Sequence, residues 1–353
     1  MNRPLRQIVP SLVITLAVAL IAGCTDTPTV PTPIVPVAAL STQSIGCVPA
    51  PPGLVGWWPG DGSANGLVSE IDLEPFGSPT FNIGLVAQAF SFDGVDDFFS
   101  RNSVPLPSAN WGMDAWVFWK GPTGEAGKFS HHIFRNGTWD VAQGAGGFDV
   151  MVLESDRTLQ VAFRSPGGWN STGVPLSTNV WSHLAVTLED GLLSVYLNAT
   201  PVFATTTSAY VPLPQVIPNG LAISAGPNAG AGLTFNGLID EVDLFNEALS
   251  AEAVAAIYAA GSAGKCKPPE ALTQLLSLEV LELDLPNGLT NSLLKKLDGA
   301  IAKLEDGKIQ PAVGKLGEFI DHVEAQRGKK IDGADADGLV ADAQAIIDAV
   351  MSG

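Results

Sequence analysis

The chain has 353 residues, of which 46% are apolar, and it contains 38 Gly and 26 Pro. This composition suits a turn-rich β domain with appended segments. Its 36 Asp and Glu against 18 Lys and Arg give a formal net charge of -18 at pH 7. Such an excess of negative charge argues against nucleic acid and anionic membrane surfaces as partners, and leaves neutral ligands and cations.

The N-terminus predicts an export signal. Arg3 and Arg6 precede an apolar run at residues 12–21, which is too short for a comfortable membrane span. The tetrad I-A-G-C that ends at Cys24 resembles a bacterial lipobox, which implies cleavage before Cys24 and acylation of its thiol. We expect residues 1–23 to be a signal peptide, and the mature chain to be exported and held in a lipid bilayer, at the outer membrane or cell surface of a bacterium.

Residues 24–46 follow as a tether rich in Pro and Thr. Pro28, Pro31, Pro33 and Pro36 have the spacing of an extended polyproline segment. At roughly 3.1 Å per residue, the tether could hold the next domain on the order of 60 Å from the lipid.

Short strands separated by turns are predicted across residues 47–266. Residues 53–58 (GLVGWW) run into a Gly-Asp turn, and residues 114–117 (DAWV) and 181–186 (WSHLAV) are further apolar runs. Several strands at intervals of roughly 8–12 residues predict an antiparallel two-sheet sandwich.

The stretch 235–258 (FNGLIDEVDLFNEALSAEAVAAIY) predicts a final strand and then a short helix. Asp240 has the same parity as Val242 and Leu244, so we expect its carboxylate to face the core, where it must be hydrogen-bonded, paired or bound to a metal. Ser250 is a suitable N-cap for the helix.

These segments closely resemble LamG-like jelly rolls of the concanavalin A-like lectin/glucanase superfamily in bacterial surface proteins. The resemblance covers residues 47–266 and implies a mainly β fold, a two-sheet antiparallel jelly-roll sandwich. Cys47 and Cys266 bracket this region. In an exported protein, two cysteines placed like this are more often bonded than free, so we predict a disulfide between them.

The resemblance also implies a structural calcium ion as a cofactor. Many LamG-like and related lectin folds hold one between an early turn and the final strand, and the matching positions here are Asp61, Asn65 and Asp240. Calcium needs about six to eight oxygen ligands, which carboxylates, backbone carbonyls and waters can supply. The alternative is that Asp240 only accepts hydrogen bonds from backbone amides of a neighbouring loop.

One motif suggests an enzyme. The run Glu70-Ile71-Asp72-Leu73-Glu74 copies the E-I-D-x-E arrangement of laminarinase-type glycoside hydrolases, in which the outer carboxyl groups of a retaining enzyme lie about 5 Å apart. In those enzymes the motif lies on a central strand. Here it follows the first strand closely and Pro75 comes next, which disfavours a central strand. We therefore expect no catalysis.

Aromatic residues in turn-rich segments are candidates for ligand contact. Trp139 and Trp169 lie in such segments, and exposed indole faces are what sugar-binding sites use for stacking. The alternative is that each indole folds over a sheet edge. The adjacent His131 and His132 have no ligand-like spacing to other side chains, so we expect solvated loop histidines.

Beyond Cys266 the composition becomes helical. Residues 267–353 predict a small all-α domain of four helices, the first starting at Pro268-Pro269 and the second capped by Thr290. Most of the run from Leu289 to Val350 is similar to the FIMAH domain, a helical module of secreted and surface proteins. That family supplies no activity that can be assigned to particular residues.

Taken together, the sequence predicts a lipid-anchored surface protein whose jelly roll binds an extracellular glycan without catalysis. The first alternative is a structural or adhesive module that docks another surface protein. The second is a glycoside hydrolase that uses Glu70, Asp72 and Glu74.

Overall fold

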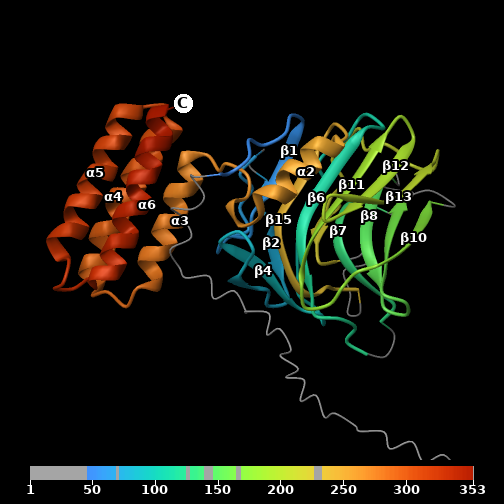
Figure 1. Cartoon of the computed structure of the whole chain (residues 1–353), viewed down its shortest axis with the longest axis horizontal. Coiled ribbons are helices and arrows are strands. Elements are labelled where there is room, and N and C mark those ends of the chain that lie inside the picture. The colour runs from blue at the N-terminus through green and yellow to red at the C-terminus, as the bar shows by residue number, and fades with distance from the viewer. Residues whose placement is uncertain are drawn as a thin grey trace, which may run out of the picture. The chain divides into compact units, whose positions relative to one another are not determined.

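The computed structural model describes residues 46–352, apart from short gaps at 69–70, 125–127, 139–145, 164–167 and 226–232. The predicted signal peptide, Cys24 and nearly all of the tether lie outside the described residues. The described chain forms a β-sandwich and, after it, a helical domain (Figure 1). No helix in the described part is both long and apolar enough to cross a membrane.

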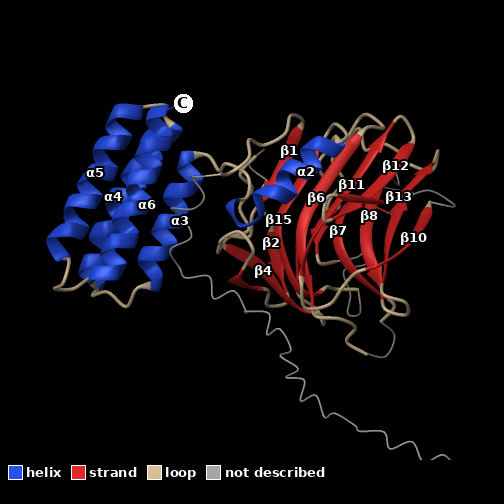
Figure 2. Ribbon diagram, viewed as in Figure 1, coloured by secondary structure: helices blue, strands red, loops and turns tan. Residues whose placement is uncertain are grey.

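The sandwich consists of two antiparallel sheets, which confirms the predicted fold class (Figure 2). The eight-stranded sheet has the order β13-β12-β11-β6-β15-β4-β3, with β1 paired to β15. Its strands are β1 (Leu54–Trp58), β3 (Thr80–Ile83), β4 (Gln88–Asp93), β6 (Trp111–Trp119), β11 (Trp181–Glu189), β12 (Leu192–Leu197), β13 (Thr200–Thr206) and β15 (Asn236–Phe245).

The seven-stranded sheet has the order β10-β9-β8-β7-β14-β5-β2. Its strands are β2 (Glu74–Phe76), β5 (Phe98–Arg101), β7 (Ser130–Thr138), β8 (Gly146–Leu153), β9 (Thr158–Phe163), β10 (Trp169–Pro175) and β14 (Leu221–Ile223). Apolar side chains alternate along the strands of both sheets and meet in one core. Trp111 of one sheet stacks on Phe148 of the other with 3.7 Å between ring centroids.

The parity predicted for Asp240 is wrong, because β15 contains a β-bulge. Glu241 has a positive φ of 51°, and the register with β6 shifts between Asp240 and Asp243. Ile239 before the bulge and Val242 after it both face the core. Asp240 therefore lies on the outer face of the eight-stranded sheet, since an extra residue in a strand reverses the alternation of its side chains.

The helix α2 (Ala251–Ala260) covers part of this outer face. The Ser250 hydroxyl caps it by accepting a hydrogen bond from the Ala253 amide, as predicted. Val254 packs on Ala185 and Phe245 of the sheet. A short 3-10 helix, η2 (Gly261–Ala263), leads to Cys266, which forms the predicted disulfide with Cys47.

The helical domain contains α3 (Pro269–Glu282), α4 (Asn287–Glu305), α5 (Ile309–Gln326) and α6 (Gly333–Ser352). Their apolar faces form a core of their own, separate from that of the sandwich. The predicted cap at Thr290 is wrong. The helix starts earlier, directly after the extended Pro286, and the Thr290 hydroxyl instead donates back to the Pro286 carbonyl at 3.4 Å.

Candidate functional site

One row of cross-strand neighbours runs over the outer face of the seven-stranded sheet from edge to edge. We call it the outer row. From β2 to β10 its members are Glu74, Ser100, Ala222, Arg135, Asp149, Ala162 and Trp169. Directly paired residues point to the same side of a sheet, and the alternate positions, such as Phe148 and Val150, lie in the core. The middle of the row is buried, with Asp149 0% exposed, whereas Trp169 at its end is 53% exposed.

A chain of hydrogen bonds supports the middle of the outer row. The Ser130 hydroxyl lies 3.0 Å from His132 Nε2, and His132 Nδ1 lies 2.8 Å from Asp149 Oδ1. This connectivity is that of a nucleophile, a base and an orienting carboxylate in acyl hydrolases. However, Ser130 is fully buried, so its hydroxyl is not presented to a substrate. These hydrogen bonds instead fix the position of Asp149.

The two histidines are therefore not solvated loop residues, and that prediction is wrong. His131 and His132 both lie in β7, and both are buried. His131 pairs with Glu154 of the segment after β8, and burial together with nearby Lys128 lowers the pKa of its imidazole. Gly-rich flanks concealed this strand, because they suggested a continuous loop.

Arg135 is the buried cation of the outer row. It stands directly opposite Asp149, and its Nη2 donates to the Asn219 carbonyl at 3.0 Å. Burial lowers the pKa of the Arg135 guanidinium, and the carboxylate of Asp149 offsets part of that effect. A paired, hydrogen-bonded arginine at this depth orders the middle of the sheet surface.

The exposed end of the outer row combines an aromatic ring with hydrogen-bonding groups. Trp169 begins the edge strand β10, and Ser171 on the same strand faces the same side, opposite Gln160. Gln160 Nε2 donates to the Ser171 hydroxyl at 2.7 Å. Trp139, the other predicted ligand contact, lies outside the described residues.

The hydrolase motif lies at the opposite edge of the same sheet. Glu70 is outside the described residues. The exposed Asp72 accepts a hydrogen bond from the Gly66 amide at 3.2 Å. Glu74 belongs to the edge strand β2, where it is exposed and paired with Arg101. The two described carboxylates therefore lie at an exposed edge rather than on a central strand.

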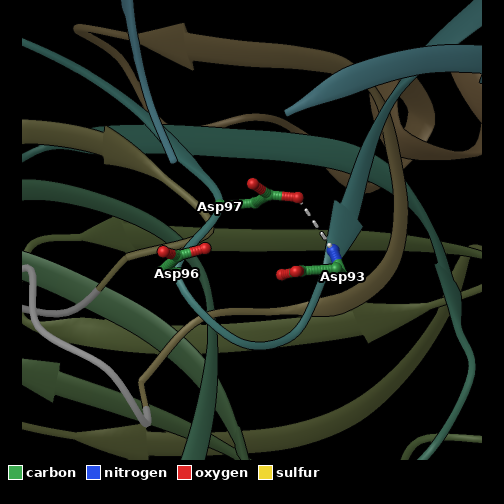
Figure 3. A group of neighbouring side chains, drawn as sticks. All are labelled: Asp93, Asp96 and Asp97. Carbon is green, nitrogen blue, oxygen red and sulfur yellow. Dashed lines mark hydrogen bonds between the residues drawn. The ribbon is translucent and has the colours of Figure 1, made fainter. Parts of the chain in front are cut away.

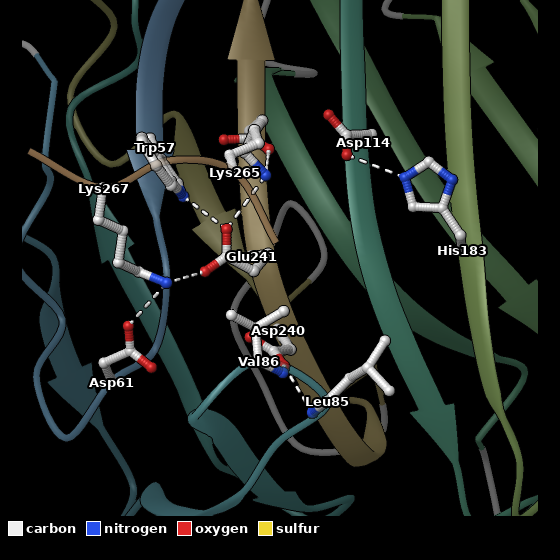
Figure 4. Close-up of polar contacts among 11 residues, drawn as sticks. Trp57, Asp61, Leu85, Val86, Asp114, His183, Asp240, Glu241, Lys265 and Lys267 are labelled. Carbon is white, nitrogen blue, oxygen red and sulfur yellow. Dashed lines mark hydrogen bonds and ion pairs between the residues drawn. The ribbon is translucent and has the colours of Figure 1, made fainter. Parts of the chain in front are cut away.

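A second polar cluster lies on the outer face of the eight-stranded sheet (Figure 4), and its two lysines are the neighbours of the disulfide cysteine Cys266 along the chain. We call it the lysine–carboxylate cluster. Lys265 Nζ lies 2.6 Å from Asp243 Oδ2 and 3.1 Å from Glu241 Oε2. Lys267 Nζ lies 2.5 Å from Glu241 Oε1 and 3.2 Å from Asp61 Oδ2. All five side chains are buried.

Charges in this cluster compensate one another in part, since burial still raises the pKa of Asp61 to about 6 and that of Asp243 well above its usual value. Burial opposes ionisation of Glu241, but Lys267 and Lys265 outweigh it and hold the pKa of Glu241 below its usual value. Burial likewise disfavours charged lysines, yet the surrounding carboxylates raise the pKa of both Lys265 and Lys267. The Trp57 indole donates to Glu241 Oε2 at 3.0 Å and completes its hydrogen bonds. The bulge at Glu241 makes this pairing possible because it turns that side chain to the outer face.

The three predicted calcium ligands do not share one environment. Asp61 and Asp240 are buried in or beside the cluster, while Asn65 is exposed. Asp240 Oδ2 accepts from the Leu85 and Val86 amides at 2.8 and 2.9 Å, which is the alternative proposed for it above (Figure 4). Asp240 Oδ1 has no hydrogen-bond partner among the described residues, so this oxygen could still face a cation.

Another acidic group, which the sequence did not single out, lies between β4 and β5. Asp93, Asp96 and Asp97 bring one carboxylate oxygen each within 4.8 Å of the others (Figure 3). Asp97 accepts from the Ser78 amide at 2.6 Å and from the Asp93 amide at 3.2 Å, and burial raises its pKa. These bonds shape the turn, and the remaining oxygens are of the kind that bind calcium.

Comparison with protein families agrees with the two-domain architecture. Residues 93–255 match the model of the concanavalin A-like lectin/glucanases superfamily, and residues 270–348 match the model of the FIMAH domain. No curated protein sequence matches the chain.

Solved structures with a similar sandwich come from several kinds of protein. One is domain 4 of a GH43 extracellular arabinanase from Geobacillus stearothermophilus, solved with arabinotriose, at 18% identity over 57% of this chain and 96% of that one, with a TM-score of 0.44. The binding domain of Paraclostridial Mosquitocidal Protein 1 matches at 13% identity over 58% and 52%, TM-score 0.44, and Trypanosoma rangeli sialidase at 14% over 62% and 36%, TM-score 0.41. With scores below 0.5, these likenesses carry no argument about a ligand or a reaction.

Sequence reasoning singled out Trp169, Asp61 and Asp240, whose predicted roles stay predictions, and did not single out Arg135, Asp149, Lys265 and Lys267. The two lysines did carry a signal, since each is a direct neighbour of Cys266 at the end of the domain. A lysine tied by a disulfide to a domain rich in acids is a candidate for burial in an ion pair. Arg135 and Asp149 gave no comparable signal, because only the sheet register makes them neighbours.

Proposed function

We propose that this protein is a non-catalytic surface protein that binds a glycan at the Trp169 edge of the seven-stranded sheet. The observation that carries the proposal is the exposed indole of Trp169 at the end of the outer row. A large, exposed aromatic ring next to oriented polar groups is typical of a binding surface. The match to a lectin/glucanase superfamily model supports carbohydrate as the ligand class.

Neighbouring polar groups suit sugar hydroxyls. The Ser171 hydroxyl accepts from Gln160, and a hydroxyl that accepts one bond keeps its proton to donate. The apolar face of a pyranose ring could stack on Trp169 while one of its hydroxyls accepts from Ser171. A glycan held this way would lie along the edge strand β10.

The test is a glycan array probed with the soluble Cys24→Ser chain. Trp169→Ala should lose the glycans that the parent binds, while Ile83→Ala should retain them, because Ile83 is similarly exposed on an edge strand of the other sheet. Equal binding by parent and Trp169→Ala would contradict the proposed site. Binding to protein ligands but to no glycan would favour the adhesive alternative.

The absence of catalysis is part of the proposal. Glu74, the outer carboxylate of the motif that the structure describes, is engaged by Arg101 at an exposed edge. Incubation with laminarin and other β-glucans should release no reducing sugar. Release that Glu70→Gln or Glu74→Gln abolishes would establish the hydrolase alternative instead.

We also propose that Cys24 carries the lipid anchor, on the strength of the lipobox and the Pro-rich tether that follows it. In a bacterial host with an outer membrane, the parent chain should incorporate radiolabelled palmitate and Cys24→Ser should not. Equal labelling of the two would contradict the anchor.

A further inference from the structure

The two buried lysines of the lysine–carboxylate cluster flank the disulfide cysteine. Lys265 and Lys267 stand on either side of Cys266, and both ammonium groups point into the cluster (Figure 4). Lys265 is 1% exposed. Its position in the cluster therefore depends on where Cys266 is held.

Few noncovalent bonds hold the backbone of this segment. The Val48 amide donates to the Gly264 carbonyl at 3.0 Å, and the Cys266 amide donates to the Val48 carbonyl at 2.9 Å. Val48 and Lys265 form an isolated bridge rather than part of a sheet ladder. The disulfide to Cys47 is thus the covalent restraint on a segment with little secondary structure.

Ion pairs alone are a weak restraint here. Buried lysines and carboxylates lose their hydration, and this loss can equal or exceed their mutual attraction. When the segment opens, both kinds of group regain water. Closing a loop of 219 residues with a covalent bond opposes that opening, and removing the bond releases it.

We infer that the Lys265–Cys266 peptide bond is a redox-gated cleavage site for a trypsin-like protease. In the oxidised chain the Lys265 side chain is buried and cannot enter the specificity pocket of such a protease. A cut there would also leave the two fragments joined, because Cys266 would stay bonded to Cys47. Reduction removes both protections, and cleavage then releases the helical domain.

The chemistry needs a thiol reductant and water. A thiolate attacks one sulfur of the Cys47–Cys266 bond and forms a mixed disulfide, and a second thiol resolves it, so that two thiols are oxidised and two cysteines are formed. The protease then adds water across the Lys265–Cys266 bond, giving a carboxylate on Lys265 and a free amine on Cys266. Lys267 offers no second site, since Pro268 follows it and trypsin does not cut before proline. The released fragment, residues 266–353, keeps its own core.

Brief trypsin digestion of the full chain, with and without dithiothreitol, tests the inference. Mass spectrometry follows the peptide that begins at Cys266, and tryptophan fluorescence follows the sandwich. We expect this cut only in the reduced chain, with a fluorescence change no larger than that of Trp57, whose ring centroid lies 5.1 Å from Lys265 Nζ and 5.8 Å from Lys267 Nζ. Lys128, buried two residues before β7 begins, serves as an internal reporter of global unfolding. Resistance of the reduced chain at Lys265, or equally fast cutting after Lys128, would overturn the inference.

Glu241→Gln separates the role of the charges from that of the backbone. This change leaves both lysines short of negative charge, so reduced Glu241→Gln should be cut after Lys265 at least about tenfold faster than the reduced parent. The oxidised variant should still retain the helical domain through the disulfide. Lys265→Met should abolish the cut in either background. Equal rates for reduced parent and reduced Glu241→Gln would show that the cluster does not hold the segment.

Discussion

The polar side chains on the two outer faces of the sandwich differ in how deeply they are buried. On the eight-stranded sheet, the lysine–carboxylate cluster is buried, and its lysines form ion pairs with its own carboxylates. On the seven-stranded sheet, the outer row has a buried pair, Arg135 and Asp149, in its middle and ends at the exposed Trp169. A network of buried charges destabilises the fold when one partner is removed, whereas a row that reaches solvent offers contacts to a ligand. This difference leads us to assign stability to the first face and binding to the second.

Removing a charge from the lysine–carboxylate cluster should have the largest effect, and the effect should be on stability. Glu241→Gln leaves Lys265 and Lys267 buried without their shared partner, which should lower the free energy of unfolding by about 3–5 kcal/mol. Urea denaturation of the oxidised chain measures it. The matched control is Glu247→Gln, an exposed site where the change should stay within about 0.5 kcal/mol. Similar midpoints for the two variants would remove the distinction between the faces.

In the helical domain, the half-buried acid Glu279 is neutralised by a proton instead of a lysine. Burial and the neighbouring Asp342, with smaller effects of Glu282 and Asp335, raise the pKa of Glu279 to about 8. The folded domain then holds a proton that the unfolded chain has lost, so its stability should fall as pH rises from about 4.5 to about 8.

Glu279→Gln should remove this dependence and raise the free energy of unfolding at pH 8 by about 2–4 kcal/mol relative to the parent, with little difference at pH 4.5. Urea denaturation followed by circular dichroism at a helix wavelength, at both pH values, provides the measurement. A variant with the same pH dependence as the parent would place the proton elsewhere.

At the exposed end of the outer row, a substitution should reduce ligand binding and leave stability unchanged. Trp169→Ala should weaken glycan affinity by about 2 kcal/mol, roughly thirtyfold, because exposed aromatic anchors dominate binding surfaces. Titration calorimetry with the best array ligand measures it, and Ile83→Ala is the control. The urea midpoint should stay close to that of the parent. A large fall in stability without a loss of affinity would show that Trp169 stabilises the fold and does not bind the ligand.

Calcium should have the smallest effect. Lys267 already supplies a positive charge to Asp61, so any ion bound at Asp61 and Asp240 should bind weakly. Binding to the folded state alone adds about 0.4 kcal/mol when the ion concentration equals its Kd. We expect a slight rise in melting temperature over excess EGTA, and Asp240→Asn should abolish it. Superimposed curves for the parent would discard the site.

Local signals predicted much of the architecture. The Ser250 cap and the disulfide were correct because a cap depends on adjacent residues and a chain with three cysteines offers few possible pairs. The prediction that Asp240 faces the core was wrong because no local pattern marks the bulge at Glu241. A positive φ at a non-glycine residue is unfavourable by itself, and here the Glu241 amide bonds to Pro59 while its side chain binds both lysines.

By itself, the sequence determined the order of the domains and the pairing of Cys47 with Cys266. It also determined the alternation of apolar and polar residues along the strands and the apolar faces of the helices. These features depend on periodicity, on neighbours along the chain and on the small number of cysteines. Only the tertiary structure decided which polar residues meet. Lys267 reaches Asp61, and Arg135 stands opposite Asp149, through strand register and a bulge that act between residues far apart in sequence. Register is set when the whole core packs, because a slip of one residue would exchange the buried and exposed faces of a strand.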